Sequence, residues 1–282
     1  MISIEHNQEF VWLNDGLIPI SQARVPVNDR GFLYGDGLFE TLRAEAGRVL
    51  FLSEHLERLG ASARAFRLPF PADFPWQERL AQVLTANGLS RGLARVKFLL
   101  TRGVAPGLGL PEGRRPTLVI YAEAYTPPSP EAYAAGWPVV IFPEGRSTFV
   151  GRHKSLNYLF YLAARQFALD QGAQEALILE ADGLVSEGAA TSLIYLHQGQ
   201  YYLPASASAL PGVTVTVLGR GLAARGLPLE ARRTTVAQLK EADGLWLANS
   251  LMGLMPVAAV NGAPVPVSPA TAFLQQVLAD MS

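Results

Sequence analysis

Short apolar runs separated by turn residues characterise the start of the chain. Phe10 to Leu13 and Leu17 to Ile20 flank Asn14-Asp15-Gly16, and two apolar runs around such a turn predict a β-hairpin. Ser53 has a side chain suited to a helix N-cap. Behind it, apolar side chains recur at helical spacing, at Leu56, Leu59, Ala63 and Phe66. The first part of the chain is therefore expected to mix α and β structure.

Proline marks the middle of the chain. Two predicted strands precede it, at Ala94 to Arg102 and at Thr117 to Tyr125. Thr126-Pro127-Pro128-Ser129-Pro130 is too rich in proline for a helix or a strand, which makes it the best linker candidate. We expect an N-terminal α/β domain over residues 1–125, an interdomain linker over 126–136 and a C-terminal domain over 137–282.

The second half intersperses predicted strands with predicted helices. Trp137 to Phe142 is expected to be a strand, and Leu156 to Gln171 a helix ended by Gly172. Further helices should start near Gly212 and span Ala272 to Leu278. Two more hairpins are predicted, one from Ala176 to Glu180 with Leu184 to Ser186, the other from Ser192 to His197 with Tyr201 to Leu203. So many hairpins argue against a regular parallel doubly wound sheet, so the fold class expected is α/β with α+β character.

Composition narrows the classes of function. Of the 282 residues, 49% are hydrophobic and 17% charged, which is enough for a sizeable core. The formal net charge of −1, without basic runs, gives no reason to expect nucleic acid or a membrane as partner. The chain has no cysteine, which excludes disulfides and thiolate metal sites, and no metal is expected. Met1 to Phe10 lacks the apolar run of a signal peptide, so we expect a soluble, cytoplasmic protein that acts on small molecules.

Lysine is scarce in this chain, with only Lys97, Lys154 and Lys240 present. Lys97 alternates with apolar residues in a predicted strand and is expected to point to its polar side, while Lys240 lies on a polar helical face. Lys154 lies at the entrance to the predicted Leu156 to Gln171 helix. Positive neighbours and a helix N-terminus would both lower the pKa of its amine, which makes it the best candidate for Schiff-base chemistry.

The segment around Lys154 also carries a family resemblance. His153-Lys154-Ser155-Leu156-Asn157 is similar to the lysine segment of class IV aminotransferases, which include D-amino-acid transaminases, branched-chain transaminases and aminodeoxychorismate lyases. The resemblance implies fold type IV, with a smaller mixed α/β N-terminal domain and a larger, cofactor-binding C-terminal pseudo-barrel. It implies pyridoxal 5'-phosphate held as a Schiff base on Lys154, amino acid and 2-oxo acid substrates, and a homodimer.

Two segments of the first half agree with this resemblance. Asp29 to Thr41 looks like the N-terminal signature of the family, which implies that Tyr34 and Phe39 line the substrate side-chain pocket. Glu54 to Leu59 resembles the segment whose arginine binds the cofactor phosphate, which implies this role for Arg58. Taken by itself, an arginine on an amphipathic helix is usually a surface residue.

The second half contains a matching acidic motif. Val185 to Ser192 looks like the glutamate motif of the family, which implies that Glu187 faces the pyridine nitrogen. A carboxylate there favours the protonated ring, and this ring withdraws electrons from the substrate Cα. Tyr158 matches the tyrosine that, in branched-chain transaminases, binds near the phenolic oxygen of the cofactor.

A predicted helix start offers an anion site. Leu210 to Thr216 contains the start of the helix near Gly212, where free N–H groups and the positive end of the helix dipole attract anions. The segment also resembles the phosphate-binding helix start of the family, and Asn249 to Val257 resembles the remaining phosphate-side loop. The phosphate contacts implied are Val213, Thr214, Asn249 and Ser250.

The substrate carboxylate requires a cationic partner, and two arginines are candidates. Thr101-Arg102-Gly103 resembles a segment of D-amino-acid transaminases and aminodeoxychorismate lyases, which makes Arg102 the first choice. Arg95 lies earlier in the same predicted strand and corresponds better to an arginine of branched-chain transaminases. Both candidates stay open.

The resemblance allows more than one reaction. Phe39-Glu40-Thr41 and the uncharged run Val104 to Leu110 favour a transaminase of the branched-chain or D-amino-acid type. Asn249 to Gly253 instead resembles 4-amino-4-deoxychorismate lyase, which releases pyruvate and 4-aminobenzoate. A more remote alternative is a non-catalytic phosphate-ligand binding protein that uses Gly35-Asp36-Gly37 and the helix start at Gly212. Transamination is the preferred hypothesis.

Overall fold

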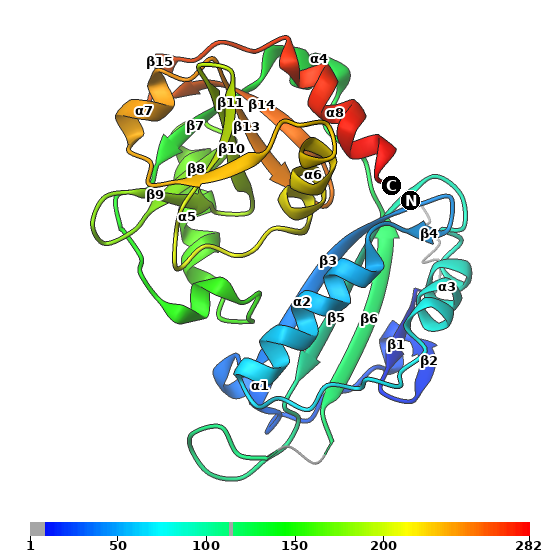
Figure 1. Ribbon diagram of the computed structural model, residues 1–282. Helices are drawn as coiled ribbons and strands as arrows, with labels where there is room; N and C mark the ends of the chain where they lie inside the picture. Colours follow the sequence, from blue (N-terminus) through cyan, green and yellow to red (C-terminus); the bar gives the residue numbers. More distant parts are fainter. Residues whose placement is uncertain (1–8, 113–114) are drawn as a thin grey trace, which may run out of the picture. The chain divides into compact units, whose positions relative to one another are not determined.

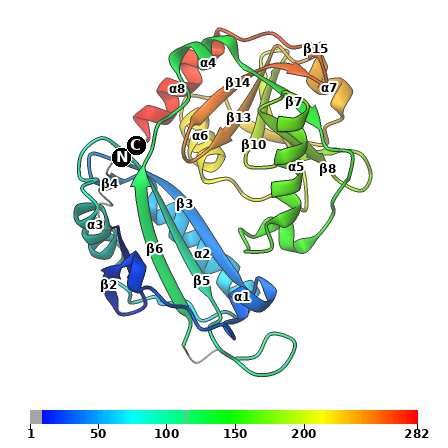
Figure 2. The same ribbon diagram turned by 180° about the vertical axis from the view of Figure 1, so that it is seen from behind.

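The computed structural model describes residues 9–112 and 115–282. Contacts divide the chain into two compact units, whose elements are labelled in Figures 1 and 2. Unit 1 comprises the chain up to Thr126 and the segment Lys154–Asn157, while unit 2 comprises Pro127–His153 and Tyr158–Ser282. Within the described ranges, no helix is long and apolar enough to cross a membrane.

Unit 1 is built on a six-stranded sheet in the order β2-β1-β6-β5-β3-β4, and all its neighbouring strands are antiparallel. The predicted N-terminal hairpin is confirmed, with Phe10 paired to Pro19 and Leu13 to Gly16. The two predicted strands of the central pair, β5 and β6, also form. The strands are β1 Phe10–Leu13, β2 Gly16–Pro19, β3 Gly37–Glu45, β4 Arg48–Val49, β5 Leu93–Thr101 and β6 Thr117–Ala124.

Two helices, α2 and α3, bury one face of this sheet. Side chains alternate along β3 and β5, so Leu42, Val96 and Phe98 point into this core while their neighbours point to the opposite face. The Ser53 cap prediction is wrong, because the helix begins at Leu52, two residues earlier than a Ser53 cap requires. Phe51 is the N-cap residue, and its left-handed backbone (φ 53°) turns the chain into the helix. The helices of unit 1 are η1 Ile20–Gln22, α1 Arg30–Tyr34, α2 Leu52–Ala65 and α3 Trp76–Ala86.

A short segment from the second half of the sequence extends the edge of β3. The Phe39 amide donates to the Lys154 carbonyl at 2.8 Å, and the Leu156 amide donates to the Gly37 carbonyl at 2.9 Å. Leu38 and Ser155 form the bridge between these two bonds. At Gly37 a Cβ atom would come within 2.7 Å of the Leu156 side chain, so glycine permits this close approach.

This edge pairing corrects the predicted helix after Lys154. The helix starts at Leu159 rather than Leu156, with Tyr158 as its N-cap residue. Lys154 is therefore extended and paired to a strand, and a helix N-terminus is not what surrounds its amine. Backbone hydrogen bonding to β3 competes with helix formation for the same amide groups. In the folded chain these groups bond to the edge of β3, so the helix starts later.

Unit 2 contains a nine-stranded mixed sheet in the order β12-β11-β10-β13-β14-β7-β8-β9, with β15 paired to β14. Three pairs are parallel, namely β7 with β8, β7 with β14, and β11 with β12. The sheet is curled (Figures 1 and 2), in agreement with the pseudo-barrel expected for the larger domain. Its strands are β7 Trp137–Ile141, β8 Glu175–Leu179, β9 Val185–Gly188, β10 Ser192–His197, β11 Gln200–Pro204, β12 Leu229–Arg232, β13 Gly244–Asn249, β14 Gly253–Val260 and β15 Ala263–Pro264.

Helices cover the sheet of unit 2 and bury its core. α6 and α8 pack together against β13 and β14, with Leu218, Trp246 and Leu274 fully buried between them. The residues 126–136 that were expected to form a linker include a helix, α4, which begins at Pro130 behind the Ser129 cap. The helices are α4 Pro130–Ala135, η2 Phe149–Arg152, α5 Leu159–Asp170, α6 Val213–Ala223, α7 Val236–Lys240 and α8 Ala270–Asp280.

Candidate functional site

Lys154 lies against an aromatic ring of unit 1. Its Nζ is 4.6 Å from the centroid of the Phe39 ring, within the range of a cation–π interaction. Phe39 itself is buried, with 5% of its surface exposed. The two backbone bonds to β3 fix the lysine main chain on one side of this ring. Phe39 and Lys154 are thus brought together within unit 1.

Arg58 belongs to a buried polar cluster on the helix-covered face. Its Nε and one terminal nitrogen donate to the two carboxylate oxygens of Glu40, at 2.8 and 2.5 Å, and His55 Nδ1 lies 2.7 Å from the same carboxylate. Burial favours a high pKa for Glu40, but Arg58 and His55 outweigh it and lower the pKa to about 2. The carboxylate orients the Arg58 guanidinium. Sequence reasoning missed Glu40 and His55 as its partners.

The charge of Lys154 affects the pKa of His55. Burial lowers the pKa of His55, Glu40 opposes this effect, and the charges of Arg58 and Lys154 reinforce it. A neutral imidazole can donate one N–H to Glu40 through Nδ1. The pKa of His55 thus depends on three charged side chains of unit 1, those of Glu40, Arg58 and Lys154.

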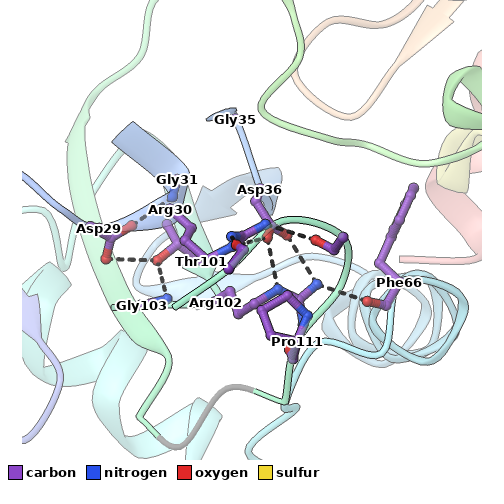
Figure 3. Close-up of polar contacts among 12 residues, drawn as sticks. Asp29, Arg30, Gly31, Gly35, Asp36, Phe66, Thr101, Arg102, Gly103 and Pro111 are labelled. Carbon is purple, nitrogen blue, oxygen red and sulfur yellow. Dashed lines mark hydrogen bonds and ion pairs between the residues drawn. The ribbon is translucent and has the colours of Figure 1, made fainter. Parts of the chain in front are cut away.

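Arg102 is held by polar contacts with residues of its own unit (Figure 3). It is fully buried, and its Nε and one Nη donate to Asp36. The remaining N–H groups donate to the backbone carbonyls of Arg67, Phe66 and Pro111. A guanidinium has five N–H donors, and all five are used here. The prediction that Arg102 binds the substrate carboxylate is therefore corrected: this arginine anchors loops.

Arg30 completes the same network. Its Nε donates to Asp36 at 2.7 Å, and its other nitrogens donate to the carbonyls of Gly107 and Gly109. The pKa of Asp36 is lowered: burial opposes the shift, but hydrogen bonds from Arg102 and Arg30 outweigh it. The loop after β5 is thereby tied to helix α1. These structural roles within the Asp29 to Thr41 segment were not foreseen from the sequence.

The remaining residues proposed to face the substrate differ in exposure. Tyr34 is 52% exposed and packs against the Arg30 guanidinium, which lies 5.0 Å from the centre of its ring. Arg95 is exposed and forms an ion pair with Glu123 on the neighbouring strand. An exposed, paired arginine of this kind is an ordinary surface feature, so this position does not by itself favour binding of a substrate carboxylate by Arg95.

Glu187 occupies a defined position in unit 2. The Tyr161 hydroxyl donates to its Oε1 at 2.8 Å, and the Leu210 amide donates to its Oε2 at 3.0 Å. Glu187 is 6% exposed, so these two donors satisfy an otherwise costly buried charge. Tyr161 was missed by the sequence analysis, because a tyrosine in an apolar helix is normally a packing residue.

Tyr158 lies beside Tyr161, with ring centroids 5.1 Å apart. Its hydroxyl donates to the Ala189 carbonyl at 3.2 Å. Burial raises the pKa of Tyr158, and Glu175 and Glu187 raise it further. The phenol therefore stays protonated, and it is tied to the turn that follows Glu187.

Glu175 is a second buried acid of unit 2 that sequence reasoning missed. It has no exposed surface, and its Oε2 accepts bonds from the Ala190 amide and the Thr191 hydroxyl, both at 3.2 Å. Burial raises its pKa, while Arg165, 3.7 Å away, opposes the shift. Glu175 thus holds the turn after Glu187 in place.

The helix start predicted from Leu210 to Thr216 is confirmed. Gly212 is the N-cap residue of α6, and Val213 and Thr214 are buried in the first turn. A Cβ on Gly212 would come within 2.3 Å of the Ser192 hydroxyl. The α6 N-terminus is therefore closely approached by β10.

Asn249 organises the loop between β13 and β14. Its side-chain oxygen accepts bonds from the amides of Leu251 and Met252, at 3.0 and 2.9 Å, and its nitrogen donates to the Ala190 carbonyl. Ser250 follows within this turn, partly exposed. Asn249 thus connects the loop to the turn behind Glu187.

The pattern of residues along this fold matches a known family. The family model for class IV amino-transferases matches residues 37–260 of this chain. The chain belongs to the class IV aminotransferases.

Relatives and solved structures agree with the family. A D-alanine aminotransferase of Staphylococcus haemolyticus is 28% identical, over 94% of this chain and 95% of that protein. A branched-chain-amino-acid aminotransferase-like protein of Arabidopsis thaliana is also 28% identical, over 96% of this chain. The chain spans about half the length of that plant relative, since the match covers 50% of it.

Solved structures with the same fold include transaminases. A fold IV transaminase of Curtobacterium pusillum has a TM-score of 0.82 at 29% identity, covering 94% of this chain and 91% of that one. A T.th. branched-chain amino acid aminotransferase, complexed with N-(5'-phosphopyridoxyl)-L-glutamate, reaches 0.87 at 24%, covering 97% and 93%. A Legionella pneumophila structure named for 4-amino-4-deoxychorismate lyase has 0.85 at 26%, covering 92% and 96%. The class IV aminotransferase chain described here therefore has fold type IV.

Proposed function

We propose that this class IV aminotransferase uses pyridoxal 5'-phosphate to move an amino group between an amino acid and a 2-oxo acid, with Lys154 forming the Schiff base. The observation that carries the proposal is the placement of Lys154. Its main chain is pinned to β3 by two backbone bonds, and its amine lies at the Phe39 ring. A lysine held in this way has little conformational freedom to lose when it reacts.

The residues of this chain suit the proposed cofactor. Glu187, oriented by Tyr161 and Leu210, offers a buried carboxylate for a pyridinium nitrogen. The α6 start at Val213 and Thr214 offers amide donors for a phosphate. Further phosphate contacts are proposed from Arg58, Asn249 and Ser250. When bound, the cofactor supplies a conjugated ring that accepts the electron pair left on the substrate Cα.

The chain's own groups then perform the proton transfer. The Lys154 amine would take the proton from the substrate Cα and return it. The Glu187 carboxylate, held by the Tyr161 hydroxyl and the Leu210 amide, would face the ring nitrogen of the cofactor. The Tyr158 phenol, which stays protonated because its pKa is raised, can donate a hydrogen bond. Phe39 limits the access of water to the amine from one side.

The composition of the loop after β5 favours transamination over the lyase reaction. Val104, Leu108 and Leu110 are exposed in this loop, and Val104 to Leu110 carry no charge. A loop of this kind provides no charged contact for a second carboxylate such as that of aminodeoxychorismate. The lyase remains the second candidate, supported by the neighbour named for that activity.

We also propose a homodimer. Several large apolar side chains are exposed on and around α1 and on the loop that Arg30 ties to it. Single exposed apolar residues are common, whereas several in neighbouring segments are candidates for an interaction surface. The group comprises Val27 (79% exposed), Phe32 (75%), Leu33 (50%), Val104 (50%) and Leu108 (87%). A second copy of this chain is the occupant that the family resemblance implies.

The test of the proposed function is chemical trapping. Protein purified with pyridoxal phosphate should become resistant to dialysis of the cofactor after borohydride treatment, with the adduct mapped to Lys154 by peptide mass. Lys240→Ala is the matched control, because Lys240 is an exposed lysine of unit 2. Trapping at another lysine, or none, would refute the proposal.

A substrate panel separates the two reactions. Amino acids added without an acceptor should change the cofactor spectrum and yield a stoichiometric amount of 2-oxo acid if transamination occurs. Release of pyruvate from aminodeoxychorismate without any added oxo acid would instead establish the lyase.

A further inference from the structure

One carboxylate of unit 2 binds serine side chains from separate segments of the chain. Glu180 follows β8, at the start of the turn that leads into β9. Its Oε2 accepts hydrogen bonds from the hydroxyls of Ser147 and Ser208, at 2.5 and 3.0 Å. Its Oε1 accepts a hydrogen bond from the Ser206 hydroxyl. These four residues form the Glu180 cluster.

Glu180 is ionised at neutral pH. Burial raises its pKa, but the hydrogen bonds from Ser147, Ser206 and Ser208 outweigh this effect and lower the pKa. An ionised carboxylate only accepts hydrogen bonds, so the serine hydroxyls are directed toward it. The carboxylate therefore ties the turn after β8 to the two segments that carry the serines.

The segment between β11 and α6, residues 205–212, belongs to no helix or strand. Its buried amides consequently need partners from side chains. Three successive amides have such partners, namely Ser208 with Glu180 at 3.2 Å, Ala209 with the Ser206 hydroxyl at 2.9 Å and Leu210 with Glu187 at 3.0 Å. The path of this segment is thus set by the Glu180 cluster at its start and by Glu187 near its end.

Glu180 and Glu187 belong to the same hairpin. The pairing of β8 with β9 shifts its register between Val185 and Glu187, so Ser186 is an extra residue of β9. The hydroxyl of Ser186 lies 2.8 Å from that of Ser206. The hairpin therefore carries both acids that hold residues 205–212, and the bulge brings β9 into contact with the Glu180 cluster.

We propose that Glu180 is a positioning residue, which holds residues 205–212 so that the Leu210 amide keeps its hydrogen bond to Glu187. The inference rests on the proposed function, in which Glu187 faces the ring nitrogen of the cofactor. Leu210, together with the Tyr161 hydroxyl, orients the Glu187 carboxylate. This orientation matters because a hydrogen bond weakens steeply when its angle at the hydrogen falls below about 120°.

Two substitutions disturb the cluster, and a third serves as the matched control. Glu180→Gln keeps the shape of the side chain and removes its charge. Ser206→Ala removes the hydroxyl that accepts from the Ala209 amide. Asp182→Asn is the control, because it removes the charge of another acid of the same hairpin, whose partner is the exposed Arg233. Thermal unfolding of each variant checks that the fold is retained.

Cofactor binding is measured with two ligands. Protein freed of cofactor is titrated with pyridoxal phosphate and with pyridoxal, which lacks the phosphate but keeps the ring nitrogen. Weakening of one hydrogen bond at that nitrogen should raise both Kd values about tenfold in Glu180→Gln, whereas Asp182→Asn should match the wild type. A loss confined to pyridoxal phosphate would place the effect at the start of α6 and overturn the assignment.

A double-variant comparison tests whether the effect passes through Glu187. The Kd for pyridoxal is measured for Glu187→Ala, Glu180→Gln and the combined variant. A positioning role predicts that the combined variant binds no more weakly than Glu187→Ala, because no carboxylate remains to be oriented. Losses that multiply would show that Glu180 acts independently of Glu187, and would overturn the proposal.

The remaining outcomes are equally decisive. Wild-type Kd values in both Glu180→Gln and Ser206→Ala would overturn the positioning role and leave the transaminase proposal standing. If Glu180→Gln fails to fold, Ser206→Ala decides by the same criteria. Failure of borohydride trapping at Lys154 in the wild type would overturn the proposed function, and the inference with it.

Discussion

Glu40 provides the sharpest test of how unit 1 is stabilised. The substitution Glu40→Gln keeps the shape of the side chain but removes its charge. Arg58, with 9% of its side chain exposed, would then lose the ionised carboxylate that accepts two of its hydrogen bonds, and His55 would lose the same ionised acceptor. We expect unit 1 to become markedly less stable.

The magnitude follows from the pKa of Glu40. The fall from the ordinary value of 4.5 to about 2 corresponds to about 3 kcal/mol, at 1.36 kcal/mol per pKa unit. Removal of one partner from a buried ion pair costs about 3–5 kcal/mol, which agrees. Because folding depresses this pKa, the stabilisation is present above pH 4.5 and is lost as the pH falls through about 2. The difference between wild type and variant should therefore shrink over that range.

Urea unfolding at neutral pH, repeated at decreasing pH, measures the effect. Glu123→Gln is the control, because Glu123 forms an exposed pair with Arg95 and should contribute less than about 1 kcal/mol. If Glu40→Gln unfolds within about 1 kcal/mol of the wild type at pH 7, the carboxylate does not hold this cluster and the reasoning fails.

Two further outcomes are expected. Arg102→Met should reduce the free energy of unfolding by about 3–5 kcal/mol, because it leaves a largely buried Asp36 with only one arginine; wild-type stability in urea would contradict this. Gly103→Ala should lower Tm strongly, since the residue has φ +71° and a Cβ would lie 2.0 Å from the Arg115 carbonyl, whereas Gly88→Ala, with open space around it, should cost less.

Local patterns in the sequence were sufficient for most elements. The N-terminal hairpin, the strands of the central sheet and the start of α6 depend on neighbouring residues, since alternation, turn residues and helix spacing act within a few positions. The family resemblance is carried by short motifs in the same way. The sequence therefore determined the fold class, the family and the identity of Lys154 as the candidate lysine.

Tertiary structure alone decided what the charged side chains do. Arg102 donates all its hydrogen bonds to carbonyls and a carboxylate from distant parts of the chain. Strand register places Lys97 next to the Phe39 ring. Lys154 is extended rather than helical because the edge of β3 offers its neighbours backbone partners. Long side chains have the same appearance in a sequence whether they are paired, buried or available. Their partners come from residues that only folding brings within hydrogen-bond distance, and the partners determine which charge remains for a substrate.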